Sequence, residues 1–162
     1  MFRYANILSA LQKAEGFKDK PYICPKGAKT IGWGFNITSN GYPSWLQGRN
    51  FNTRPLSEQE GLILLKSGVE EAEKQVRNLL TSPVYDALSL PRQDAVIEMC
   101  FNVGVGSMSG FVNTIKALSD KDYTLAATEM LDSQWATSEL RGLVERAKRL
   151  SKQIRTGLIQ RV

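Results

Sequence analysis

The segment from residue 58 to residue 80 limits the possible folds more than any other part of the sequence. Ser57 and Glu60 form a capping-box pattern at its start. Its apolar residues then recur at alternating steps of three and four, as Leu62, Leu65, Val69, Ala72, Val76 and Leu79. This spacing predicts one amphipathic helix over residues 58–80. At about 1.5 Å per residue the helix would span roughly 35 Å, which is long enough to connect two lobes.

A short β-containing region is predicted before this helix. Residues 3–15 have the apolar spacing of a helix, which the following glycine would end. Residues 22–24 suit a short strand, and the "PKG" that follows suits a type I turn. In "TIGWGF" at 30–35 the alternation favours the second strand of a hairpin, with the two glycines on its bare face. Such a face could form the floor of a cleft, with the Thr30 hydroxyl at its end.

The rest of the chain is predicted to be a loop followed by helices. Residues 36–55 are rich in Asn, Ser, Gly and Pro, which indicates a loop. Helices are expected near residues 84–89, 92–103, 109–119, 122–131 and 138–156. The predicted fold class is therefore α+β, mainly α, in a single domain over residues 1–162. It would consist of a small β-containing lobe at 16–57, a linking helix at 58–80, and a helical lobe formed by 1–15 and 81–162.

The composition of the chain excludes several classes of protein. With 42% hydrophobic residues the chain can bury a core, and no apolar run is long enough to cross a membrane. The N-terminal residues interrupt every apolar stretch, so no secretory signal is predicted. Cys24 and Cys100, the only cysteines, lack the spacing of a zinc site or a disulfide framework, which fits a reducing compartment. The net charge of +5 would attract polyanions, although the basic run at 141–157 also suits a solvated helix face.

Three residues near the predicted hairpin have the types and spacing of a hydrolytic site. Glycoside hydrolysis typically needs a protonated acid and, on the opposite ring face, a group that activates water or stabilises positive charge. Glu15 ends the first predicted helix on its apolar side, where partial burial and the helix dipole both favour a protonated carboxyl. Cys24 follows after eight residues and Thr30 after five more, so all three are expected near the mouth of the hairpin.

Nearly the whole chain carries short motifs in addition to these three residues. They are "EGF" at 15–17 with Tyr22, "TIGWG" at 30–34, "PVYDAL" at 83–88, "MCFNVG" at 99–104, "GF" with Asn113 at 110–113, Trp135, and "RAKR" at 146–149. Together they resemble the phage-type lysozymes, the endolysins of glycoside hydrolase family 24. The catalytic signature of that family is a glutamate, an aspartate or cysteine after eight residues, and a threonine after five more. Glu15, Cys24 and Thr30 match this spacing, and the resemblance implies a lysozyme-like domain.

The resemblance implies a role for each of these three residues. Glu15 would protonate the oxygen that bridges N-acetylmuramic acid and N-acetylglucosamine, and Thr30 would help to hold the attacking water. Cys24 takes the position of the catalytic aspartate. By similarity, Arg146 is the arginine that pairs with the catalytic glutamate across the cleft. The resemblance implies no metal and no cofactor.

Further positions match substrate-binding residues of the family. Phe101, Asn102, Thr114 and Glu129 align with sugar-contacting positions of the helical lobe, although Thr114 and Glu129 differ in type from the best-known member. Phe35 stands where that member has a histidine, and the chain contains no histidine at all. A glutamate must therefore do the acid chemistry.

The two cysteines are expected to have different roles. A thiol has a pKa of about 8.5, so Cys24 would supply much thiolate at neutral pH only if that pKa is lowered. Lys26 and Lys29 are close in sequence, and either ammonium would lower that pKa if it came near the sulfur. The alternative interpretation of Cys24 is a small hydrophobic residue at a strand end. Cys100 lies on a predicted helix four residues after Val96 and is expected to pack in the core.

The sequence therefore predicts an endolysin muramidase that hydrolyses peptidoglycan at the β-1,4 bond, with inversion, and lyses the bacterial host. We expect a monomer that binds no nucleic acid and leaves the host cytoplasm for the periplasm and cell wall through a separate holin. A lytic transglycosylase, which needs one catalytic glutamate, is an alternative. A silent peptidoglycan-binding module and a basic nucleic-acid binder are two others, but a pure binder has no need of Glu15 as a positioned acid.

Overall fold

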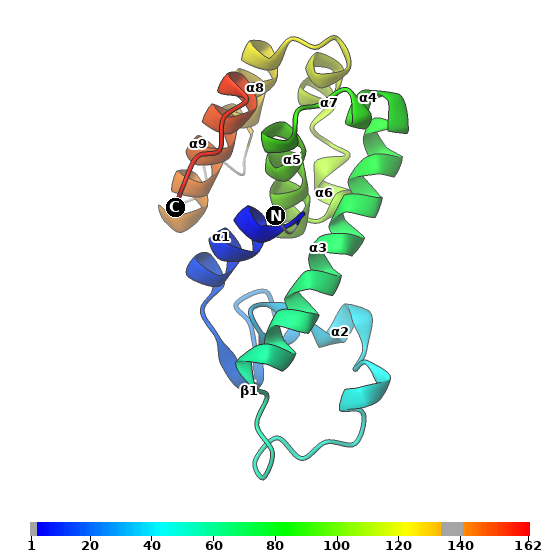
Figure 1. Ribbon diagram of the computed structural model, residues 1–162, viewed down its shortest axis with the longest axis vertical. Coiled ribbons are helices and arrows are strands. Elements are labelled where there is room, and N and C mark those ends of the chain that lie inside the picture. The colour runs from blue at the N-terminus through cyan, green and yellow to red at the C-terminus, as the bar shows by residue number, and fades with distance from the viewer. Residues whose placement is uncertain (1–2, 134–140) are drawn as a thin grey trace. The chain divides into compact units, whose positions relative to one another are not determined.

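The computed structural model describes residues 3–133 and 141–162 and divides into two compact units. The smaller unit comprises residues 8–68, and the larger one comprises the described residues of 1–7 and 69–162. The chain is mainly helical and has one three-stranded antiparallel sheet (Figure 1). This architecture confirms the predicted α+β fold class.

The smaller unit holds the sheet and several short helices. In chain order its elements are the part of α1 (Ala5–Glu15) from residue 8 on, β1 (Lys18–Ile23), β2 (Lys29–Gly32), β3 (Phe35–Asn36), α2 (Ile37–Asn40), a 3-10 helix (Ser44–Leu46) and the start of α3 (Glu58–Leu80). The prediction of a loop over 36–55 missed the two short helices. Helix α2 forms there because the Asn36 side chain caps it, accepting a hydrogen bond from the N–H of Ser39 at 2.9 Å.

The secondary-structure elements in the described part of the larger unit are all helices. After α3 its helices are α4 (Ser82–Asp86), α5 (Leu90–Val103), α6 (Val105–Met108), α7 (Val112–Ser119), α8 (Tyr123–Leu131) and α9 (Arg141–Thr156). The helix predicted at 84–89 starts earlier, because Pro83 suits a first helical turn. The start of the helix predicted at 138–156 lies outside the described residues. Helix α8 packs against both α7 and α9, and α9 packs against α5 (Figure 1).

The long helix α3 has the predicted bounds and begins with the predicted capping box. The N–H of Ser57 donates to Oε2 of Glu60 at 2.9 Å, and the N–H of Glu60 donates to Oγ of Ser57 at 3.1 Å. Arg49 donates two more hydrogen bonds to the Glu60 carboxylate, at 2.9 and 2.5 Å. These hydrogen bonds lower the pKa of Glu60 to about 2, and those from Arg49 have the largest effect. The start of α3 is thereby linked to the loop that precedes it.

The first hairpin forms, but its first strand covers Lys18–Ile23 and not the predicted residues 22–24. Gly27 donates its N–H to the carbonyl of Cys24 at 2.8 Å, which closes the predicted turn, and Cys24 donates its own N–H to the carbonyl of Ala28 at 2.9 Å. Strands β1 and β2 are antiparallel, with Tyr22 opposite Thr30. The hairpin therefore places Cys24 at its tip, next to the end of the ladder.

The prediction of a single strand over residues 30–35 is wrong. Strand β2 ends at Gly32, and the chain reverses so that Ile31 pairs with Phe35 of β3. Gly32 and Gly34 have φ values of +65° and +85°, a backbone conformation that favours glycine. The two glycines therefore form a tight turn around Trp33 and do not line the floor of a cleft along a strand.

The core of the smaller unit explains one wrong expectation for α3. The core consists of Ile31, Ile37, Leu46, Phe51, Leu56 and Leu64, with Phe17, Phe35 and Tyr42 packed against it. A β-carbon at Gly61 would lie 2.6 Å from the Phe17 ring and 3.2 Å from the Trp33 ring, so this face of α3 meets the aromatic rings directly. Leu62, predicted to be buried, lies off that face and is 39% exposed.

Buried polar contacts attach the N-terminal residues to the larger unit. Arg3 donates a hydrogen bond to Oδ1 of Asp94 at 2.5 Å. Glu73 of α3 accepts hydrogen bonds from the hydroxyls of Tyr4 and Tyr85, the latter at 2.8 Å. Burial and the Glu73 carboxylate raise the pKa of Tyr4 to about 12. The N-terminal residues are therefore fixed to α3 and α5.

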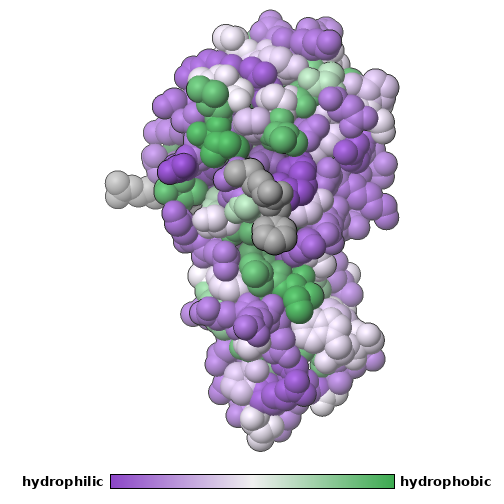
Figure 2. All heavy atoms as spheres, in the orientation of Figure 1, coloured by the Kyte–Doolittle hydropathy of each residue, from purple (hydrophilic) through white to green (hydrophobic). Residues whose placement is uncertain are grey.

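The visible surface is mostly hydrophilic. Figure 2 shows hydrophobic residues in separate patches within a face of polar and charged side chains. Within the described part of the chain, no helix combines the length and the apolar character needed to cross a bilayer.

Candidate functional site

Glu15 lies where the first helix of the smaller unit meets the glycine turn. It is the last residue of α1 and is half-buried. A β-carbon added at Gly34 would lie 3.6 Å from Oε2 of Glu15. The turn at Gly34 therefore lies beside the carboxylate, and a methyl group at this position would be in van der Waals contact with it. The sequence suggested a cleft floor at these glycines, whereas the group found beside Gly34 is the Glu15 carboxylate.

Tyr22 connects the surroundings of Glu15 with those of Cys24. Burial is the largest cause that raises the pKa of Tyr22, and the negative charges of Glu15 and Cys24 raise it further. Both groups therefore lie within electrostatic range of the same phenol on β1. The smaller unit brings two of the three predicted catalytic residues to one region around this tyrosine.

The hairpin tip stabilises the ionised form of Cys24. The N–H of Ala28 contributes most to lowering the pKa of the Cys24 thiol, and partial burial opposes it. The N–H of Lys26, the hydroxyl of Thr30 and the charge of Lys26 lower this pKa further, in that order. The charge of Lys26 thus lowers this pKa, as expected if one of the two lysines lay near the sulfur, but it is not the main cause. Backbone donors of the turn contribute more than Lys26, and Lys29 is not among the largest causes.

Thr30 is held next to Cys24 by the register of the hairpin. Its side chain is buried, with 4% of the residue exposed, and its hydroxyl donates to the carbonyl of Ala28 at 3.0 Å. The same hydroxyl stabilises the Cys24 thiolate. Because a hydroxyl has one proton, it can donate to the carbonyl or to the sulfur at one time, but not to both. The state of the sulfur and the orientation of the hydroxyl are therefore coupled.

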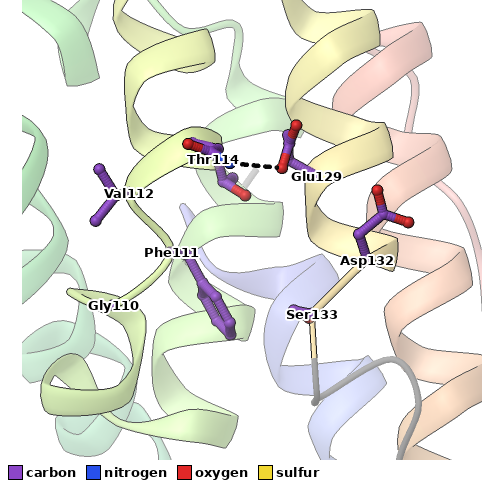
Figure 3. Close-up of a pocket in the computed structure, with 8 residues that line it drawn as sticks. Gly110, Phe111, Val112, Thr114, Glu129, Asp132 and Ser133 are labelled. Carbon is purple, nitrogen blue, oxygen red and sulfur yellow. Dashed lines mark hydrogen bonds between the residues drawn. The ribbon is translucent and has the colours of Figure 1, made fainter.

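Two of the predicted substrate-binding residues meet at a pocket in the larger unit. Thr114 of α7 and Glu129 of α8 line a pocket of about 200 Å³ (Figure 3). Its other walls are residues 110–113, before and at the start of α7, and Asp132 with Ser133 after α8. Nδ2 of Asn113 donates a hydrogen bond to Oε2 of Glu129 at 3.1 Å. Sequence reasoning missed Asp132, although its spacing of three residues from Glu129 on a helix predicts a shared face.

The other predicted substrate-binding residues lie elsewhere in the larger unit. Phe101 and Asn102 are half-buried in the last turn of α5 and are not part of the pocket wall. Arg146 is buried on α9, where its Nε lies 4.0 Å from Oε1 of Glu98. Arg149 also pairs with this carboxylate. The predicted pairing of Arg146 with Glu15 would join the two units and stays a prediction.

Cys100 is a packed residue of α5, as predicted. It is buried, and burial followed by the charge of Glu71 raises the pKa of its thiol to about 11. Both cysteines are free thiols. The described residues contain no cluster of three or more acidic, histidine or cysteine side chains that could hold a metal ion. Trp135, part of the motif set, lies outside the described residues.

Comparisons with known proteins agree with these observations. Residues 12–149 match the family model described as Phage lysozyme. Probable T4-type lysozyme 2 of Dictyostelium discoideum is 28% identical over 146 residues, which cover 82% of this chain and 86% of that protein. Probable T4-type lysozyme 1 of the same organism is also 28% identical, over 81% of this chain and 85% of that protein. The pre-baseplate central spike protein Gp5 of Enterobacteria phage T4 is 26% identical over 96% of this chain, which corresponds to 28% of that protein.

Proposed function

The chain belongs to the phage lysozyme family and is a lysozyme-like peptidoglycan hydrolase, and we propose that it cleaves the β-1,4 bond between N-acetylmuramic acid and N-acetylglucosamine. The observation that carries this proposal is the position of Glu15 at the end of α1. Its carboxylate lies beside the turn at Gly34. The charges of Glu15 and Cys24 both raise the pKa of Tyr22, so all three groups are within electrostatic range. The Glu15 carboxyl can serve as the general acid on a glycosidic bond, and the partly ionised Cys24 thiol can serve as the second group that this reaction needs.

Glu15 is the proton donor in the proposed reaction. Its carboxyl proton passes to the bridging oxygen while the bond from that oxygen to the muramic acid C1 breaks. Positive charge then develops on C1 and on the ring oxygen. Protonation of the leaving oxygen lowers the barrier because the sugar departs as a neutral alcohol.

Cys24 and Thr30 act on the attacking water. Because turn N–H groups lower the pKa of the Cys24 thiol, more of it is thiolate at neutral pH than for an ordinary cysteine. The thiolate accepts a proton from the water as the water oxygen bonds to C1, and the Thr30 hydroxyl orients that water. Attack from the face opposite the leaving oxygen inverts C1. Glu15 ends as a carboxylate and Cys24 as a thiol, and proton exchange with solvent restores both.

We also propose the cellular setting that the resemblance implies. The protein accumulates as a monomer in the host bacterial cytoplasm and reaches the periplasm and cell wall at lysis through a separate holin. Its net charge of +5 supports attraction to the anionic wall. Wall lysis is then expected to slow as ionic strength rises, because salt screens this attraction.

The decisive experiment compares the pH dependence of wall lysis between the native protein and variants of the proposed site. Cys24→Ala is expected to lose at least about a hundredfold in rate, the lower range for one acid-base group. Cys24→Asp is expected to remain active and to reach its plateau at lower pH, since an aspartate ionises near pH 4. Glu15→Gln provides the inactive reference. A Cys24→Ala protein as active as the native one would remove the sulfur from the mechanism.

Product analysis separates the proposed hydrolase from its alternatives. New muramic acid reducing ends are expected, whereas 1,6-anhydromuramic ends would identify a lytic transglycosylase. The lytic transglycosylase is favoured by one observation. Glu15 is the only carboxylate among the three predicted catalytic residues, and a transglycosylase needs only one. Binding to walls without bond cleavage would identify a silent module, and retention on duplex DNA at physiological salt would identify a nucleic-acid binder.

A further inference from the structure

The face of the first hairpin that carries Cys24 also carries a tyrosine. Tyr22 of β1 pairs with Thr30 of β2, and the N–H of Cys24 continues the ladder by donating to the carbonyl of Ala28 at 2.9 Å. Side chains alternate along a strand, and directly paired residues share a face of the sheet. Tyr22, Cys24 and Thr30 therefore project from one face, and Tyr22 is half-buried there.

Tyr22 lies near the proposed proton donor as well as near Cys24. The negative charges of Glu15 and Cys24 both act on its phenol, so the two groups are within electrostatic range of one hydroxyl. In the described structure both act through charge and neither through a hydrogen bond, so the hydroxyl is bound to neither group. Burial and these two charges raise the pKa of Tyr22 above its ordinary value of 10.0. The phenol therefore keeps its proton at neutral pH and is present as a hydrogen-bond donor.

The proposed reaction moves one negative charge from Cys24 to Glu15. Before cleavage, Glu15 is a neutral carboxyl group and Cys24 is a thiolate. The glutamate gives its proton to the bridging oxygen, and the sulfur takes a proton from the water that bonds to C1. Afterwards Glu15 is a carboxylate and Cys24 is a neutral thiol. The pair thus carries a single negative charge throughout, and Tyr22 is within electrostatic range of both of its positions.

We propose that Tyr22 is a positioning residue whose hydroxyl donates a hydrogen bond to the Cys24 thiolate before bond cleavage and to the Glu15 carboxylate after it, an inference that rests on the proposed function. Catalytic hydrogen bonds are often long without substrate and tighten in the complex. No proton leaves the phenol, because only the acceptor of its hydrogen bond changes. In the transition state both groups carry part of the charge, and one donor within range of both stabilises that charge wherever it lies.

The first test compares Tyr22→Phe with the native protein in wall lysis across pH and wall concentration. The variant is expected to lose about tenfold in kcat with little change in KM, the scale of one hydrogen bond to a charged group. A hydrogen bond to an ionised acid lowers the pKa of that acid. Its loss is therefore expected to move both limbs of the activity profile to higher pH, because the pKa values of Cys24 and Glu15 both rise.

The pH profile separates this role from a structural one. A residue that only supports the fold would lower the rate without moving either limb of the profile. The charge of Lys26, which also acts on the Cys24 thiol, is the same in both proteins. Limbs at the native pH values, or a loss confined to KM, would overturn the proposal.

Tyr42→Phe is the matched control. Tyr42 is also half-buried in the smaller unit, and the centroid of its ring lies 5.6 Å from Nζ of Lys29. Lys29 directly precedes Thr30 on β2, so its side chain is on the opposite face of the hairpin. This control is expected to keep the native kcat and pH profile. A control that changes both as Tyr22→Phe does would overturn the proposal, because the effect would then follow from loss of any tyrosine hydroxyl in this unit.

The second test does not depend on catalysis. The protein is isotope-labelled at the tyrosine ζ carbon, and the Tyr22 signal is followed by NMR as the pH is raised. Two steps are expected, one in the acidic range as Glu15 ionises and a later one as Cys24 ionises. Glu15→Gln is expected to remove the first step and Cys24→Ala the second. A native signal that lacks either step would overturn the proposal.

The two tests together distinguish failure of this inference from failure of the proposed function. Native protein that leaves walls intact but shows both steps in the Tyr22 signal would reject the proposed function and leave Tyr22 as a donor shared by the two groups. Native protein that lyses walls without these steps would reject the role of Tyr22 and leave the proposed function in place.

Discussion

Gly34 lies beside Glu15, since a β-carbon added at Gly34 would lie 3.6 Å from Oε2 of the glutamate, an ordinary van der Waals distance. The fold thus brings the end of α1 next to the turn between β2 and β3. The same position has a φ of +85°, so glycine also suits its backbone conformation.

We predict that Gly34→Ala lowers wall lysis at least about tenfold while costing about 1 kcal/mol of stability. The added methyl would touch the carboxylate and reduce its access to water and to substrate. Initial lysis rates and urea unfolding measure the two effects separately. Gly41→Ala is the matched control, because Gly41 has a φ of +69° and open space around its β-carbon position. Equal losses of activity in both variants would mean that backbone strain, not contact with Glu15, is responsible.

Cys24 is predicted to react with iodoacetamide in the folded protein, whereas Cys100 is not. The pKa of the Cys24 thiol is lowered by turn N–H groups, while that of the buried Cys100 thiol is raised to about 11. Thr30→Val is expected to slow the alkylation of Cys24 severalfold, since the hydroxyl that stabilises the thiolate is lost. Mass spectrometry of proteolytic fragments measures both rates. An unchanged rate in Thr30→Val would show that the hydroxyl does not contact the sulfur.

Glu60 is predicted to make stability depend on pH in the acidic range. Its pKa is about 2 in the folded protein, below the ordinary value of 4.5, because Arg49 and Ser57 stabilise the carboxylate. The stabilisation is therefore complete above about pH 4.5 and is lost as pH falls toward 2. Glu60→Gln keeps a capping side chain but removes the charge, so its stability curve should be flatter in this window. Urea unfolding at several pH values tests this, and parallel curves for the two proteins would contradict it.

Glu98 is predicted to be a structural residue of the larger unit. It is 3% exposed and faces Arg146 and Arg149, and burial raises its pKa while the two guanidinium groups oppose the rise. Glu98→Ala would leave buried positive charge without this partner, at a cost of about 3 kcal/mol or more. The exposed Glu145, paired with Lys148 at 3.5 Å, is the control, and Glu145→Gln should change stability by less than about 1 kcal/mol. Similar midpoints of urea unfolding in both variants would refute the structural role.

Local sequence determined those parts of the fold that depend on neighbours along the chain. The capping box of Ser57 and Glu60, the bounds of α3 and the turn after Cys24 were all predicted, because each needs only residues within one or two turns of backbone. The spacing of Glu15, Cys24 and Thr30 likewise indicated the family, because a motif is defined by residue types and intervals along the chain.

Tertiary structure decided the burial, close contacts and pKa shifts that depend on residues far apart in the sequence. Only the folded smaller unit places Gly34 against Glu15, and only the core of Phe17 and Trp33 against Gly61 leaves Leu62 exposed. The pKa of Cys24 follows backbone N–H groups whose direction sequence does not reveal, and Asp132 joins Thr114 because α8 packs on α7. The pattern of side chains along the sequence predicts helices, strands and their caps. Burial, close approach and electrostatic partners arise from packing between elements that are far apart in the chain.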